Sequence, residues 1–136
     1  EYTATRQLDK ALLDRFTVIE MDLLTQDEEY GLLKYMFPTV EEKLLENVSS
    51  ITSLTRAEAL TENPRISSGV STRTSVEIAG LLFDGFSLLE SADITIYPQY
   101  DSTGGVDSER TFVKQIVQKF MDDGSSDDLF DVEEEN

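Results

Sequence analysis

An arginine near the start of a predicted helix is the first residue whose position could serve chemistry. Residues 69–90, GVSTRTSVEIAGLLFDGFSLLE, have the apolar periodicity of a helix, and Ser71 is its expected N-cap. Arg73 then lies in the first turn, where the helix dipole disfavours a cation by roughly 0.3–1 kcal/mol. One interpretation is a solvated arginine that tolerates this position. The other is a guanidinium that binds an anion outside the helix, and a nucleotide phosphate is the natural partner.

A second arginine, Arg15, allows the same two interpretations. The segment LLDRF places Asp14 and Arg15 between apolar residues, directly before a predicted strand. The pair could be a local ion pair at a helix end. Alternatively, Arg15 could be presented to a neighbouring subunit, where an arginine supplied in trans stabilises the charge of a phosphoryl-transfer transition state.

The elements that must position these arginines are predicted to be mainly helical. Residues 6–16 predict a short helix, and FTVIEMDL, residues 16–23, predicts one short strand because it is rich in β-branched residues. Three S/T-x-x-E pairs, beginning at Thr25, Thr39 and Ser87, match the capping box that opens a helix. The expected helices run from Thr25 to Pro38, from Thr39 to about Leu60, from Ser71 to near Gly85, from Ser87 to about Ile96 and from Asp107 to Met121, with loops at 61–69 and 97–105.

These segments, taken in order, resemble the C-terminal part of an AAA+ ATPase. The segment KALLDRFTVIEMD, a helical region and then GVSTRTSVEIAGLL follow the pattern of the branch that holds MoxR-like ATPases and the small subunits of cobalt and magnesium chelatases. In that branch a Leu-Asp-Arg-Phe segment precedes the last core strand, and a Ser-Pro-Arg or Ser-Thr-Arg opens a helix of the lid that follows. The resemblance covers roughly residues 6–122.

The resemblance implies roles for both arginines. By position, Arg15 looks like the arginine finger that acts in trans, and Arg73 looks like the sensor 2 arginine that contacts phosphates bound by its own subunit. Arg6 and Arg65 are lower-ranked alternatives, since neither lies in a matching motif. The implied cofactors are ATP and Mg²⁺, and the implied partners are the rest of the AAA+ core, identical subunits in a ring and a client or metal-binding subunit.

The chain departs from the family in one large respect. It contains no Gly-x-x-x-x-Gly-Lys-Ser/Thr phosphate cradle and no apolar strand that ends in an Asp-Glu pair. In the family these parts lie N-terminal to the matching region. The chain also begins with Glu rather than Met, which indicates processing or a piece of a longer protein. We therefore expect no ATP hydrolysis from this chain alone.

The C-terminal segment is strongly acidic and predicts disorder. Between residues 122 and 136 there are eight acids and no base. Its acids could bind divalent cations, but such runs are usually only solvated, and no metal ligand is assigned. Leu129 and Phe130 lie inside this acidic run and could dock into a partner groove, loosely like the acidic Leu-Phe tails with which some phage proteins bind sliding clamps.

Composition excludes several other function classes. The net charge of −17 disfavours bare nucleic acid and anionic membranes. The chain has no cysteine and no histidine, which removes disulfides, thiolate chemistry and the commonest general base. No apolar run approaches the length of a transmembrane helix and no signal peptide is visible, so a cytoplasmic location is expected.

The predicted fold class is thus mainly α: an AAA+ lid of four to five helices with one strand left from the α/β core. Residues 1–24 would end the core, 25–122 would form the lid and 123–136 the disordered tail. The predicted function is the lid and arginine-finger region of a ring-forming ATPase that couples hydrolysis to remodelling or metal-chelatase work. The alternative is a non-enzymatic acidic helical module whose tail docks a partner protein.

Overall fold

Five α-helices make up the part of the chain that the computed structural model describes, residues 24–121, and no strand occurs within it. The mainly helical prediction is therefore confirmed for this part. The predicted helix at 6–16, the strand at 16–23 and the acidic tail lie outside the described residues. The helices are α2 (Gln26–Met36), α3 (Glu42–Ala59), α4 (Thr72–Phe83), α5 (Leu88–Thr95) and a last helix over 109–121, with short 3₁₀ helices η2 (Tyr97–Gln99) and η3 (Gly105–Asp107) before it.

Two of the three predicted capping boxes are present. The Thr25 hydroxyl accepts the backbone N–H of Glu28 while the Glu28 carboxylate accepts that of Thr25, and Ser87 and Glu90 make the same pair of bonds. Each box satisfies N–H groups that a helix start leaves without partners inside the helix. The sequence thus fixes the starts of α2 and α5 locally.

The predicted box at Thr39 is wrong, and the last helix begins after the predicted start at Asp107. Helix α3 begins two residues later, after Glu41, whose side chain makes no capping bond. Residues 38–40 instead form a turn that buries Val40 against the core, and this burial shifts the helix start. Asp107 lies in η3, and the hydroxyl of Ser108 accepts the N–H of Thr111 to begin the last helix.

Helix α4 ends as the sequence predicts, at a glycine. Gly85 has a φ of +101°, a conformation that costs a residue with a side chain about 1–2 kcal/mol. The N–H of Phe86 reaches the carbonyl of Leu81, and the N–H of Gly85 reaches that of Leu82. These two bonds form a Schellman motif, which satisfies carbonyls at the helix end.

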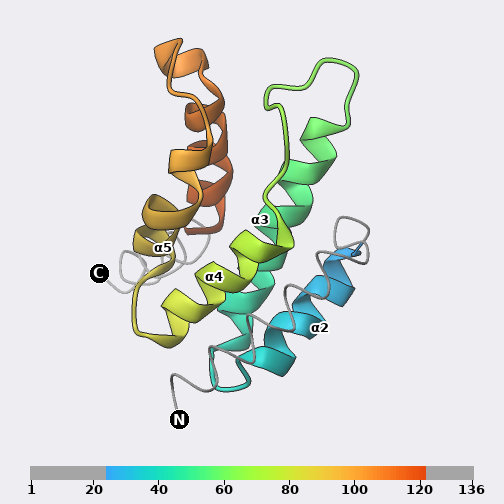
Figure 1. Cartoon of the computed structure of the whole chain (residues 1–136), viewed down its shortest axis with the longest axis vertical. Helices are drawn as coiled ribbons and strands as arrows, with labels where there is room; N and C mark the ends of the chain where they lie inside the picture. The colour runs from blue at the N-terminus through green and yellow to red at the C-terminus, as the bar shows by residue number, and fades with distance from the viewer. Residues whose placement is uncertain (1–23, 122–136) are drawn as a thin grey trace, which may run out of the picture.

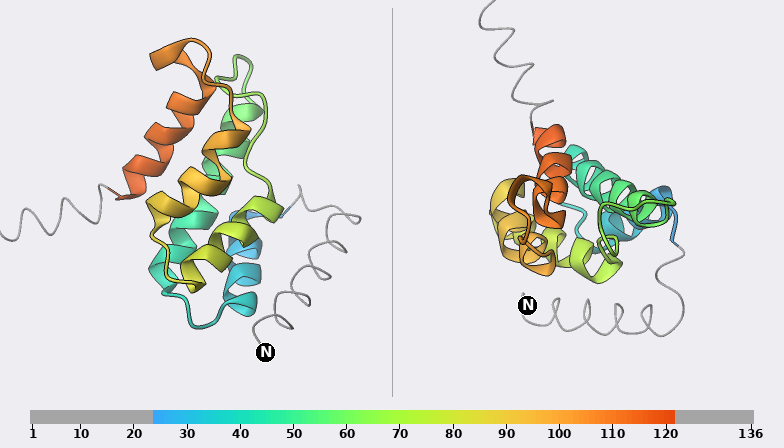
Figure 2. Two further views of the ribbon diagram at one scale, coloured as in Figure 1. Left: turned by 60° about the vertical axis from the view of Figure 1, so that its left-hand side comes forward. Right: turned by 90° about the horizontal axis from the view of Figure 1, so that it is seen from above.

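One apolar core joins the helices. Helix α3 contacts α2 and α4, and α4 contacts α5. Figures 1 and 2 show α2 on one side of α3, and the last helix beside α5 on the other. On the last helix the fully buried residues are Val113 and Val117, whereas Phe112, Ile116 and Phe120 are only partly buried. Across the helices the fully buried side chains include Leu33, Leu45, Val48, Ile51, Ile78, Ala79 and Ile96.

Within residues 24–121, the helices are all too short or too polar to cross a membrane.

Candidate functional site

The start of α4 presents Arg73 on the surface. Ser71 is the N-cap, as the sequence predicts, and its hydroxyl accepts the backbone N–H of Thr74 at 3.1 Å. Arg73 is the second residue of the helix and its side chain is exposed. The first turn of α4 contains no acid. An exposed guanidinium beside the positive end of a helix dipole forms an electropositive position suited to an anion.

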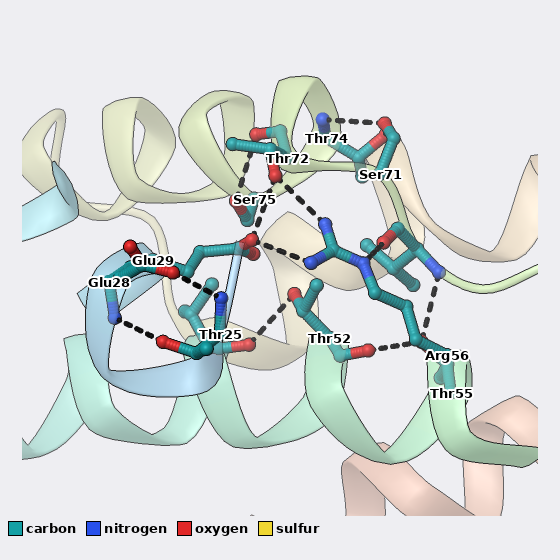
Figure 3. Close-up of polar contacts among 12 residues, drawn as sticks. Thr25, Glu28, Glu29, Thr52, Thr55, Arg56, Ser71, Thr72, Thr74 and Ser75 are labelled. Carbon is teal, nitrogen blue, oxygen red and sulfur yellow. Dashed lines mark hydrogen bonds and ion pairs between the residues drawn. The ribbon is translucent and has the colours of Figure 1, made fainter. Parts of the chain in front are cut away.

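The residue before Arg73 is fully buried and makes two charge-assisted hydrogen bonds. The Thr72 hydroxyl donates to Oε1 of Glu29 at 2.8 Å and accepts from Nη2 of Arg56 at 2.8 Å. Thr72 is 0% exposed. Glu29 comes from α2 and Arg56 from α3, so this one hydroxyl links three helices, as Figure 3 shows.

Glu29 and Arg56 also form a direct ion pair inside the protein. Nη1 of Arg56 lies 2.9 Å from Oε1 of Glu29, and the side chain of Glu29 is 1% exposed. Nε of Arg56 donates to the carbonyl oxygen of Val70 at 3.0 Å. The guanidinium therefore binds a carboxylate, a hydroxyl and a backbone carbonyl in different directions, which its rigid planar fork permits.

The backbone before α4 lies directly on α3. The N–H of Val70 donates to the hydroxyl of Thr55 at 2.9 Å. A Cβ added to Gly69 would lie 2.6 Å from Cα of Arg56 and 2.7 Å from its backbone nitrogen, so only glycine fits this approach. We call Glu29, Thr55, Arg56, Val70 and Thr72 the α4-start network.

The loop before α4 is anchored on its other side as well. The hydroxyl of Tyr100 donates to the carbonyl oxygen of Ser68 at 2.9 Å, and the carboxylate of Glu109 accepts from the backbone and hydroxyl of Ser67. Burial, with a smaller effect from the Glu109 charge, raises the pKa of Tyr100 to about 12, so its hydroxyl remains a donor at neutral pH. In α4 itself, Thr74 accepts from the side-chain amide of Gln99 at 3.0 Å.

One oxygen of the network has no hydrogen-bond partner. Oε2 of Glu29 is buried and unpaired. A cavity of about 190 Å³ lies beside the network. Hydroxyl and amide side chains line much of it, and the lining residues are Leu24, Thr25, Gln26, Glu29, Ser49, Thr52, Ser53 and Arg56.

The sequence predicted the place of Arg73 in the first turn of a helix, but it gave no sign of the network behind that turn. Glu29 reads as one of three acids in the solvated first turn of α2, and Arg56 reads as a surface cation near the end of α3. The only local signal of the network was Gly69, and this glycine is equally typical of the loop predicted at residues 61–69. The remaining contacts join residues 14 to 43 positions apart, and no pattern in the sequence encodes them.

The other predicted site residues are not part of this arrangement. The guanidinium of Arg65 lies 4.9 Å from the ring centroid of Phe112, a cation–π contact that gives it a structural role. Arg6, Arg15, Leu129 and Phe130 lie outside the described residues. Within residues 24–121, no group of three acids forms a metal-binding cluster.

Comparison with protein-family models, curated proteins and solved structures finds no match for this chain.

Proposed function

We propose that this chain contains the helical lid of a ring-forming AAA+ ATPase of the MoxR-like or chelatase branch, and that Arg73 is its sensor 2 arginine. The observation that carries the proposal is the exposed position of Arg73 in the first turn of a capped helix. The all-helical order of residues 24–121 suits a lid, and the Ser-Thr-Arg segment of the resemblance falls at a helix start.

In this proposal Arg73 contacts the phosphates of ATP bound by its own subunit. Arg15 acts across the subunit boundary as an arginine finger, and the phosphate cradle and the Mg²⁺ ligands come from the rest of the AAA+ core. ATP and Mg²⁺ are thus cofactors of the assembled ATPase. Rigid-body motion of the lid then transmits hydrolysis to a client or metal-binding subunit in the cytoplasm.

Arg73 is suited to this role by charge and by chemistry. A guanidinium presents paired N–H donors that match phosphate oxygens, and such charge-assisted bonds are about twice as strong as neutral ones. A cation at the start of a helix gains nothing from the helix dipole, so the dipole does not explain an arginine at this position.

The test is a nucleotide titration of the full-length gene product carrying Arg73→Ala. Loss of a charge-assisted bond is worth about 1.5–3 kcal/mol, so ATP binding should weaken roughly ten- to hundred-fold, and ADP binding less. The matched control is Lys119→Ala, which removes an exposed cation from the last helix. Equal ATP affinity in wild type and Arg73→Ala would refute the assignment.

A further inference from the structure

The strongest unexplained feature of the molecule is the α4-start network, because it concentrates buried polar contacts immediately before Arg73. Three charge-assisted bonds, at 2.8, 2.8 and 2.9 Å, join Thr72, Glu29 and Arg56. Two further bonds fix both backbone groups of Val70 to α3. No other part of residues 24–121 buries an ion pair to this extent, since the pair of Lys34 and Glu42 is largely exposed.

Stability alone is a weak reason for such a network. Buried ion pairs lose much of their Coulombic gain to desolvation, and apolar residues of similar volume are often as stable. Here one carboxylate oxygen, Oε2 of Glu29, is also left unpaired in the interior, which adds a further cost. What polar bonds supply, and apolar contacts do not, is a defined direction.

The direction fixed here is that of the first turn of α4. Thr72 is held from two sides by groups on α2 and α3, and Val70 is held at its N–H and its carbonyl. Gly69 lies against the backbone of Arg56, so the chain cannot move closer to α3. These contacts determine both the position and the rotation of the helix start, and hence the direction in which the next residue, Arg73, leaves the surface.

We infer that Thr72, Arg56 and Glu29 are positioning residues for Arg73, an inference that rests on the proposed function above. The network holds the Arg73 backbone so that its guanidinium meets a nucleotide phosphate, and a misplacement of about 1 Å can cost a large factor in such an interaction. None of the three touches the nucleotide. They act through Arg73, and their loss lowers affinity for ATP more than for ADP.

The inference predicts a coupling between Thr72 and Arg73 that can be measured. The full-length protein is titrated with ATP and with ADP as wild type, Thr72→Val, Arg73→Ala and the double variant. Contacting or networked residues couple strongly, so Thr72→Val should weaken ATP binding roughly three- to thirty-fold in the wild-type background. In the Arg73→Ala background the same change should have less than about a twofold effect, because the group that it positions is gone.

Two further variants separate positioning from structure. Thr72→Ser keeps the hydroxyl and should restore ATP affinity to within about threefold of wild type. Thr52→Val makes the same chemical change at a buried threonine of α3 whose hydroxyl donates only to Val48 of its own helix, so it should leave the ratio of ATP to ADP affinity unchanged. Should Thr72→Val fail to fold, Arg56→Lys replaces it, since lysine keeps the charge and loses the fork.

The outcomes distinguish the two proposals. If Arg73→Ala weakens ATP binding and Thr72→Val does not, the positioning role is overturned and the proposed function stands. An equal loss from Thr72→Val in both backgrounds, or an equal loss for ATP and ADP, also overturns the positioning role, because the effect then comes from general destabilisation. If Arg73→Ala itself changes nothing, the proposed function fails and the positioning role fails with it.

Discussion

The two ends of α4 are held by different kinds of contact. Its start is fixed by the α4-start network, in which charged and hydroxyl groups from three helices meet. Its end is held by a Schellman motif at Gly85 and by apolar packing, with the rings of Phe83 and Phe37 6.0 Å apart. Polar contacts are directional and hydrophobic contacts are not. The start of α4 is therefore oriented by side chains of two other helices, whereas its end is held by backbone bonds within its own helix and by ring packing.

The largest effect is expected from breaking the ion pair at the start of α4. Arg56→Ala leaves the buried carboxylate of Glu29 without its cation, which should lower the free energy of unfolding by about 3–5 kcal/mol. The measurement is urea unfolding of the chain followed by circular dichroism. The control is the double variant Glu29→Leu/Arg56→Met, which removes both charges and should lose clearly less than Arg56→Ala. An equal loss of unfolding free energy in the two variants would show that side-chain packing, and not the ion pair, stabilises the start of α4.

The close approach of Gly69 to α3 is the next target. Gly69→Ala places a Cβ 2.6 Å from Cα of Arg56, and because backbone atoms must move, a loss of about 1–3 kcal/mol is expected. The matched control is Gly31→Ala in α2, where a Cβ meets no atom within 4 Å. There the better helix propensity of alanine should raise stability by about 0.5–1 kcal/mol. The melting temperatures of the two variants are compared with that of the wild type. If Gly69→Ala is as stable as the wild type, the close contact between Gly69 and Arg56 is not supported.

At the opposite end of α4, Gly85→Ala should cost less. The left-handed φ of +101° disfavours a side chain by about 1–2 kcal/mol, but a Cβ there has open space. The cost is therefore conformational and local, and Gly85→Asn should lose less than Gly85→Ala because asparagine tolerates this region. Thermal melts of the two variants show which one is more stable. If the two variants lose equally, the left-handed conformation is not what decides the end of α4.

The smallest effect is expected at Ser87, the N-cap of α5, which follows the end of α4. The backbone N–H of Ser87 donates to the Glu90 carboxylate, and this bond, with a smaller effect of the Ser87 side chain, lowers the pKa of Glu90 below 4.5. This contribution to stability is present at a pH above 4.5 and is lost as the pH falls through the lowered folded-state pKa. Ser87→Ala removes the hydroxyl and keeps the backbone N–H, so the pKa of Glu90, measured by NMR titration, should rise only part of the way to its ordinary value. Asp101, whose pKa is lowered by bonds from Thr103, serves as the internal reference and should not change.

Local signals predicted most of the helical boundaries. Capping boxes at Thr25 and Ser87, the N-cap Ser71 and the terminal glycine Gly85 all depend on contacts within six residues, and each is confirmed. The predicted helix start at Thr39 was wrong for a physical reason. The S/T-x-x-E pattern of a capping box does not show whether a neighbouring side chain must be buried. Here Val40 is buried in a turn, and the helix begins only after Glu41.

Helix periodicity and capping are local, so the amino-acid pattern alone predicts a mainly helical fold, the start and end of α4 and the place of Arg73 in its first turn. The burial of Glu29 and Arg56 as partners, and their bonds to Thr72, depend on how the helices pack. Each of the three is an ordinary polar residue in its own segment. Their partnership arises when apolar packing brings α2, α3 and α4 together, and desolvation then requires their polar groups to find one another.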